Sequence, residues 1–124
     1  MAWLYVALGG AAGALLRYAA GLWLGAPRHV SFPWATFGVN VAGSLVLGMV
    51  VALVPLDDRR HLLPLLAVGF CGGLTTFSTF SLETLAMLQA RAYGLAGAYV
   101  GASLAVALAA VWAGMELGAR RAGA

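Results

Sequence analysis

The chain has 124 residues, of which 63% are hydrophobic and 9% charged. Soluble domains carry about 25% charged residues, so this chain has too little polar surface to cover a water-facing globule. Its net charge of +3 comes from arginines that lie between or after apolar runs, a pattern that indicates lipid headgroups as partners and no nucleic acid.

Four apolar runs follow one another along the chain, and each is long enough to cross a bilayer, which takes about 20 residues. The sequence therefore predicts an all-α membrane protein with one domain, 1–124, of four transmembrane helices. The expected spans are about 2–24, 34–54, 62–88 and 93–117. The N-terminus lacks the basic region of a cleavable signal peptide, so the first run is expected to stay as an anchor in the cell membrane.

The first span has Trp3 near one end and Trp23 near the other. Tryptophan favours the two membrane interfaces, so this spacing supports a complete crossing. Arg17 lies inside the span or near its end, where a charge has to pair or face a water-filled cavity. Two interpretations stay open: a structural pair with Glu83, or an anion-attracting vestibule at Arg17.

The second span carries Thr36, Asn40 and Ser44 at intervals of four residues, which places them along one stripe of a helix. An Asn in mid-span is costly unless its amide finds partners, so it either joins helices by hydrogen bonds or lines a pore. The fourth span has Tyr99 and Ser103, also four apart, which fit a polar lining or, for Tyr99, ordinary packing.

The third span departs most from ordinary membrane sequence. The glycine-rich run 69–74 leads into Thr75–Ser81, where five of seven residues carry hydroxyls. Adjacent glycines weaken a helix by about 1 kcal/mol each relative to Ala, so we expect a break near the middle of this helix. Carbonyls freed at membrane depth have to be buried, line water or hold a cation. The alternative is a continuous helix whose Ser and Thr bond to their own carbonyls.

Phe77 and Phe80 are three residues apart and share a helix face within the hydroxyl-rich stretch. Ring edges carry positive partial charge, so these phenyls can face an anion, although packing is the usual role of Phe in a membrane helix.

Two further patterns concern assembly. Five pairs of glycines are spaced four apart, which indicates close helix packing. The pairs are Gly9/Gly13, Gly21/Gly25, Gly69/Gly73, Gly97/Gly101 and Gly114/Gly118. With the N-terminus inside, four arginines near span ends would be cytoplasmic and two, Arg28 and Arg91, external. So shallow a bias permits insertion both ways round.

No enzyme is expected, because the sequence has no phosphate-binding loop, dinucleotide fingerprint, H-E-x-x-H motif or paired cysteines. The residues favour an ion-conducting protein. One alternative is a small proton-coupled exporter of the multidrug type, which needs a carboxylate deep in a span; only Glu83 and Glu116 are candidates, and both lie toward span ends. Another is a structural membrane subunit that transports nothing.

Three segments resemble the motifs of the Fluc/CrcB family of fluoride channels. They are Gly9–Tyr18, Thr36–Asn40 with Gly43, and Gly69–Ser81. The third segment is long and chemically unusual, and the resemblance covers nearly the whole chain.

The resemblance implies an antiparallel, dual-topology homodimer that passively releases fluoride from the cytoplasm through two pores. It implies a central structural Na⁺ held by the backbone carbonyls of Gly72 and Thr75 from both subunits. By the same resemblance Arg17 belongs to a vestibule. The residues that correspond to the fluoride-lining positions of the family are Asn40, Phe77, Phe80, Thr36, Ser78, Thr79, Tyr99 and Ser103.

Overall fold

A computed structural model describes residues 1–25 and 30–123, and all the regular structure within them is helical. In chain order the elements are α1 (Ala2–Leu24), α2 (Trp34–Leu53), α3 (Arg59–Leu62), the π-helix η1 (Leu63–Cys71), α4 (Gly72–Leu74), α5 (Phe77–Gln89) and α6 (Tyr93–Ala122). Among the described residues, 2–24, 34–53, 59–89 and 93–122 are long and apolar enough to cross a membrane. The prediction of four long apolar helices is confirmed, whereas the predicted loop at Arg28 lies outside the described residues.

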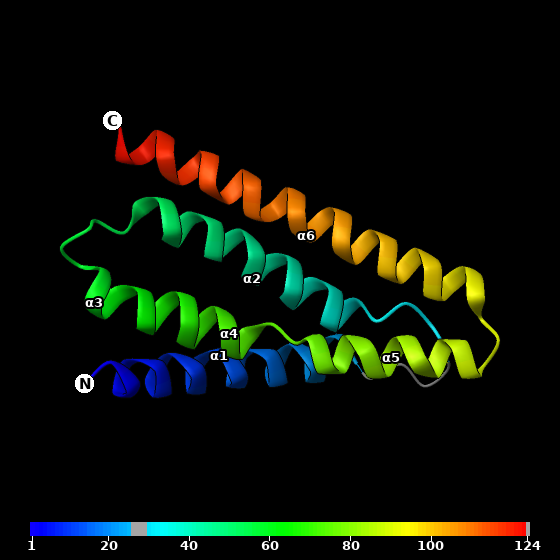
Figure 1. Ribbon diagram of the computed structural model, residues 1–124. Coiled ribbons are helices and arrows are strands. Elements are labelled where there is room, and N and C mark those ends of the chain that lie inside the picture. Colours follow the sequence, from blue (N-terminus) through cyan, green and yellow to red (C-terminus); the bar gives the residue numbers. More distant parts are fainter. Residues whose placement is uncertain (26–29, 124) are drawn as a thin grey trace.

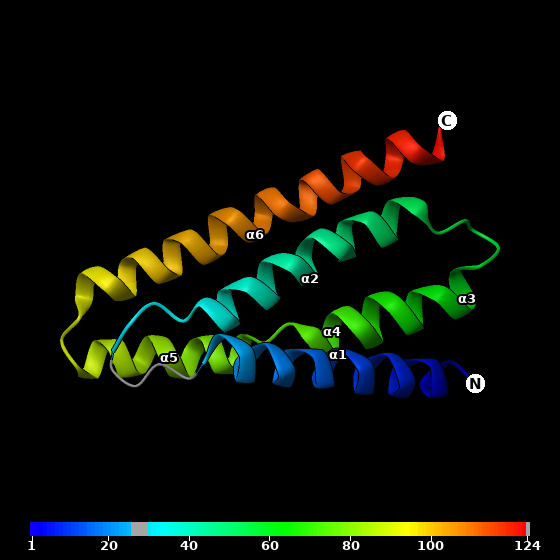
Figure 2. The same ribbon diagram turned by 180° about the vertical axis from the view of Figure 1, so that it is seen from behind.

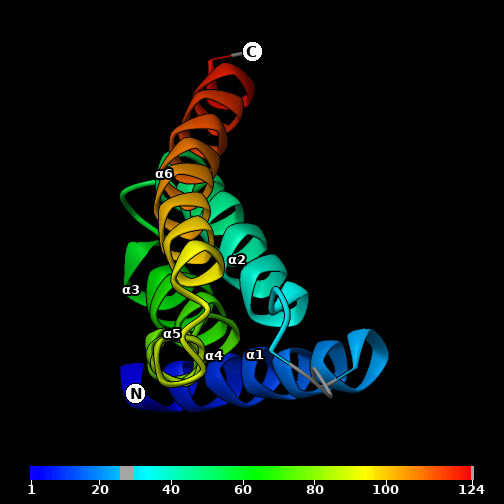
Figure 3. The same ribbon diagram turned by 90° about the vertical axis from the view of Figure 1, so that its right-hand side faces the viewer.

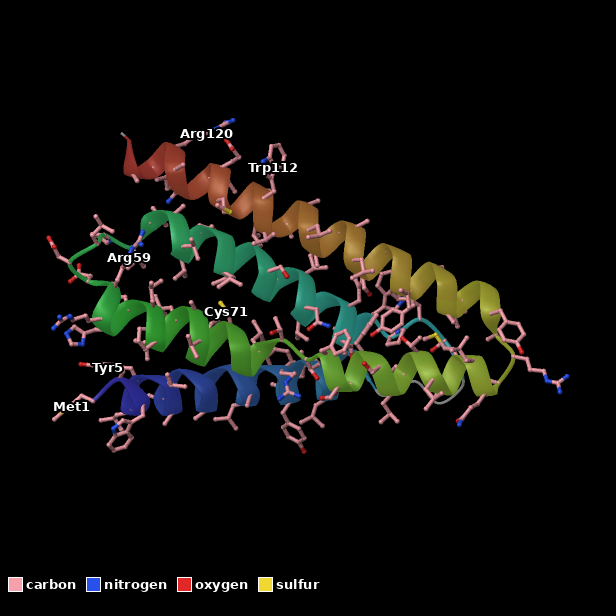
Figure 4. All side chains as sticks on the ribbon, viewed as in Figure 1. Met1, Tyr5, Arg59, Cys71, Trp112 and Arg120 are labelled. Carbon is pink, nitrogen blue, oxygen red and sulfur yellow. The ribbon has the colours of Figure 1, made fainter. Side chains whose placement is uncertain are left out.

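The four rods alternate in direction, so both termini lie at the same end as the turn between α2 and α3 (Figure 1). Met1, Arg59 and Arg120 all lie at this end (Figure 4). The closest pairs are α2 with α6 and α1 with η1. Viewed from its end, the bundle has α1 at the bottom, and α6 extends away from α1 toward the top (Figure 3). The third rod is thus paired with α1 through η1 and also contacts the α2–α6 pair.

Glycine allows the two closest pairs to form. A Cβ at Gly13 would run into the carbonyl oxygen of Phe70, and one at Gly114 would run into that of Leu45. Small residues permit such approach where lipid offers no hydrophobic drive for association. Gly69/Gly73 also meet α1, and Gly118 meets α2, whereas Gly21/Gly25 and Gly97/Gly101 face open space among the described residues.

The third rod is interrupted near its middle, as the sequence predicts. Viewed from behind, an extended stretch separates α4 from α5 (Figure 2). The continuous-helix alternative is wrong at Thr75 and Thr76, although Thr75, Ser81 and Thr84 do donate hydroxyl hydrogens to carbonyls four residues back. The rod begins at Arg59, earlier than expected. It also contains a π-helical stretch for which the sequence carries no signal, and the amide of Gly72 there reaches the carbonyls of both Ala67 and Gly69.

We expect Gly114→Ala to lower the free energy of unfolding by about 1–3 kcal/mol, because its methyl group would overlap the backbone of α2. The matched control is Gly97→Ala, where no other described helix comes within 4 Å of the new methyl group. Thermal unfolding of both variants in the same detergent provides the comparison. Equal stability of the two would contradict close packing at Gly114.

Candidate functional site

The site is centred on two residues of extended backbone in the middle of the third rod. Thr75 has φ −82° and ψ 156°, and Thr76 has φ −150° and ψ 117°, so neither continues the helix. Asn40 of α2 takes over the backbone hydrogen bonding of Thr76. Its Oδ1 accepts from the amide of Thr76 at 2.7 Å, and its Nδ2 donates to the carbonyl of Thr76 at 3.1 Å. One side chain thus satisfies both polar groups of an unwound residue, which lipid cannot do.

Thr76 also starts the second half of the rod. Its side chain is the N-cap of α5, where its Oγ1 accepts from the amide of Thr79 at 3.2 Å. The same hydroxyl donates to Oγ1 of Thr79 at 3.1 Å and lies 3.3 Å from Oγ of Ser78. The hydroxyl run therefore has a local structural role at its first residues, before any ligand is considered.

The C-terminal end of α4 leaves carbonyl groups without helical partners. Arg17 of α1 donates from Nε to the carbonyl of Gly73 at 3.0 Å, which also brings a positive charge to a helix C-terminus. In the described part of the chain, no hydrogen-bond donor reaches the carbonyl oxygens of Gly72 or Thr75. These two oxygens are free to face a cation.

Backbone carbonyl oxygens are possible metal ligands at the break. Within residues 1–25 and 30–123, no cluster of three or more His, Cys, Asp or Glu could hold one. Hard cations prefer oxygen ligands. The carbonyl oxygens of Gly72 and Thr75, the predicted sodium ligands, are therefore of the right chemical type for such an ion.

Glu83 of α5 connects three helices. Its Oε1 accepts from the hydroxyl of Thr36 on α2 at 2.8 Å, and its Oε2 accepts from the hydroxyl of Tyr99 on α6 at 2.7 Å. Arg17 donates elsewhere, so of the two interpretations of Arg17, the structural pair with Glu83 is not formed among the described residues. The half-buried carboxylate is satisfied by two neutral hydroxyls instead of by an opposite charge.

Two hollows flank the break. The central groove, of about 350 Å³, opens between α2, the break and α6. It is lined by Asn40, Gly43, Ser44, Leu47, Ala67, Cys71, Gly72, Thr75, Thr76, Phe77, Phe80, Ser103, Leu104 and Ala107. The side cavity, of about 520 Å³, lies between α1, α2 and α5. It is lined by Ala14, Arg17, Tyr18, Gly21, Leu22, Gly25, Ala35, Thr36, Val39, Thr76, Thr79 and Glu83. Thr76 borders both hollows.

Most of the predicted site residues thus face one of these two hollows. Those in the central groove are Asn40, Gly72, Thr75, Phe77, Phe80 and Ser103. Those in the side cavity are Arg17, Thr36 and Thr79. Ser78 is exposed beside the break, and Tyr99 is fully buried behind Phe80, with 5.1 Å between their ring centroids.

Two features make the central groove suitable for an anion. The side chain of Ser103 is buried, and its Oγ has no hydrogen-bond partner among the described residues. The rings of Phe77 and Phe80 both line the groove with 5.7 Å between their centroids, and Phe77 is 77% exposed. A hydroxyl without a partner among the described residues and two phenyl rings therefore share one opening.

Sequence reasoning missed Thr76 as a site residue and did not identify the partners that Glu83 has in the structure. Thr76 is one of five hydroxyl residues in a short run, and the sequence carries no signal that Asn40 pairs with this one. Glu83 could have been assigned only by knowing that Thr36 and Tyr99 approach it from two other helices.

Comparison of the sequence with known proteins identifies a matching family and several relatives. The family model for "CrcB-like protein, Camphor Resistance (CrcB)" matches residues 4–115. A protein of Acidobacterium capsulatum named "Fluoride-specific ion channel FluC" is 45% identical over 124 residues, covering 97% of this chain and 98% of the relative. A protein of the same name from Agrobacterium fabrum is 43% identical over 91% of this chain and 92% of its own length. "Fluoride-specific ion channel FluC 2" of Rhodococcus jostii is 48% identical over 92% of this chain and 96% of its own length.

We expect Asn40→Leu to destabilise the break by about 1–3 kcal/mol, because the amide and carbonyl of Thr76 would be left unpaired at membrane depth. Hydrogen exchange at the Thr76 amide should accelerate by the corresponding factor. Ser44→Ala is the control, since Ser44 donates only to the carbonyl of Asn40 on its own helix. Unchanged protection of Thr76 in Asn40→Leu would show that the side chain does not hold the break.

Proposed function

Because this chain belongs to the CrcB-like protein family, we propose that this multi-pass membrane protein is a fluoride-selective channel. It would let fluoride leave the cytoplasm passively across the bacterial cell membrane and so lower its toxicity. The observation that carries the proposal is the Asn40-held break at Thr76, which brings amide, hydroxyl and phenyl groups together at membrane depth.

The donors around the break suit fluoride. Fluoride is small and strongly hydrated, so a pore has to replace its water with several hydrogen-bond donors. Asn40 uses one Nδ2 hydrogen on Thr76 and retains the other, and the hydroxyl of Ser103 is free. Ser78 and Thr79 add hydroxyls on the other side of the break. Tyr99 and Thr36 donate to Glu83, so they would serve an anion by exchanging that partner.

The phenyl rings would give contact without strong binding. Ring edges carry only partial positive charge, so Phe77 and Phe80 would contact the anion weakly while hydroxyl groups donate hydrogen bonds to it. Weak, repeated contacts allow an ion to leave as readily as it enters. Arg17, in the side cavity, would contribute positive potential to a vestibule.

We further propose an antiparallel, dual-topology homodimer with two pores and a structural Na⁺ at its centre. The proposal is supported by the exposure of Gly72 and Phe77 on the open side of the central groove. The carbonyl oxygens of Gly72 and Thr75 would hold the ion. The ion would then be the partner that these oxygens do not have within the described part of the single chain. A second copy on this face would also remove the exposed phenyl of Phe77 from lipid.

The direct test is efflux from liposomes that contain the purified protein. Fluoride-loaded vesicles should empty quickly and chloride-loaded vesicles slowly, and Phe77→Ile or Phe80→Ile should stop fluoride release while leaving dimers intact. Leu104→Ile is the matched control, because it keeps an aliphatic side chain in the same groove. Absence of fluoride release from folded wild-type dimers would refute the channel, and normal release from both Phe variants would remove the phenyls from the mechanism.

A variant of Glu83 separates the channel from a proton-coupled exporter. A channel should keep a fluoride flux that needs no proton gradient in Glu83→Gln, although the loss of a charged acceptor for Thr36 and Tyr99 would slow it. An exporter would lose coupled transport altogether, and any remaining flux would no longer depend on pH. Efflux at several pH values, with and without a gradient, distinguishes the two.

Removal of sodium tests the central ion. Protein refolded with N-methyl-D-glucamine in place of Na⁺ should form fewer dimers, because an ion at a hundred times its Kd stabilises the form that binds it by about 2.7 kcal/mol. Cross-linking at constant ionic strength measures the dimer fraction. A dimer fraction that is the same in both salts would argue against a structural Na⁺.

A further inference from the structure

Phe32 precedes α2, outside any helix, yet its ring belongs to the packed interior. Its carbonyl accepts from the amide of Trp34 at 3.0 Å in the turn that starts α2. Its ring centroid lies 5.3 Å from that of Phe37 and 5.3 Å from that of Tyr99, with an interplanar angle of 82° to the latter. Phe32, two residues before the start of α2, thus contacts α6 through its side chain.

Tyr99 is enclosed on three sides. Phe32 meets its ring edge-to-face, Phe80 lies 5.1 Å away at 49°, and Glu83 accepts its hydroxyl hydrogen at 2.7 Å. The side chain has no exposed surface. A ring held in this way can move only if one of these neighbours moves, because well-packed interiors leave no free volume.

The contacts form a row from the loop to the central groove. Phe32 touches Tyr99, Tyr99 touches Phe80, and the ring of Phe80 lies beside that of Phe77. Three of these rings belong to α5 and α6 and take part in the proposed site. Phe32 is the one member supplied by the connection into α2, and nothing assigned so far depends on it.

We propose that Phe32 is a positioning residue for permeation: through Tyr99 it fixes the orientation of the Phe80 ring in the central groove. The inference rests on the proposed channel function. With Phe32 shortened, the ring of Tyr99 loses its edge-to-face neighbour and gains room to move, and the ring of Phe80 is then packed less firmly by Tyr99. Edge-to-face pairs are worth about 0.5–1.5 kcal/mol, so the rate should fall without the protein unfolding.

The test compares Phe32→Leu with Trp34→Leu. Trp34 is a matched control because its ring also contacts Phe32, at 4.4 Å, but it is 63% exposed and has no ring contact with Tyr99. Phe32→Tyr keeps the ring and serves as the rescue. Should Phe32→Leu fail to fold, Phe32→Met replaces it, because its longer, unbranched side chain adapts better to irregular space.

The first measurement is the ¹⁹F NMR signal of 4-fluorophenylalanine placed at position 80, which reports the ring environment whether or not ions flow. We expect Phe32→Leu to shift or broaden this signal and Trp34→Leu and Phe32→Tyr to leave it near the wild-type position. An unchanged signal in Phe32→Leu, or an equal change in Trp34→Leu, would overturn the proposal.

The second measurement is fluoride efflux, for which we expect a rate about three- to tenfold lower in Phe32→Leu and near wild type in the other two variants. A shifted signal with an unchanged rate would also overturn the role in permeation. If wild-type protein released no fluoride, the proposed function would fall, while the NMR comparison would still decide whether Phe32 orients Phe80.

Discussion

The structure depends on one constraint: backbone that leaves a helix at membrane depth has no water to bond with. At Thr76 the constraint is met by Asn40, which supplies both a donor and an acceptor. A hydrophobic residue in place of Asn40 would leave the amide and the carbonyl of Thr76 unpaired. A continuous helix would leave no free carbonyl groups in mid-span. The Asn therefore makes possible both the break and the chemistry around it, and one of its amide hydrogens remains for a ligand.

The glycine contacts decide which way the break faces. Gly13 lets α1 lie against the end of η1, and Gly114 lets α6 lie against α2. The third rod is thereby paired with α1 and also contacts the α2–α6 pair, and Arg17 of α1 and Asn40 of α2 bond to the backbone at the break. Its remaining face carries Gly72 and the largely exposed Phe77, and it opens away from the chain. Close packing within one chain thus leaves open the face that a second copy would cover in the proposed dimer.

Much of the site follows from residue types at helical spacing. The stripe of Thr36 and Asn40 and the hydroxyl run after Gly73 predict polar groups within two apolar spans, and the structure brings these groups together. The sequence left two interpretations open for Arg17, a pair with Glu83 or a vestibule. Arg17 and Glu83 are opposite charges, yet in the described structure each bonds to a neutral partner.

By itself the sequence determined four apolar helices, the position of the break and the chemical character of its surroundings, because these depend on local composition and on residues close together in the chain. Only the tertiary structure decided that Thr76 is the residue held by Asn40, that Glu83 joins Thr36 and Tyr99, and that Phe32 reaches the ring of Tyr99. These contacts cross between elements far apart in sequence, and their partners are set by helix rotation and separation. Backbone contacts at glycines fix both of those. The four-residue spacing of the glycines indicates close packing but does not say which helices meet or which pairs make the contact.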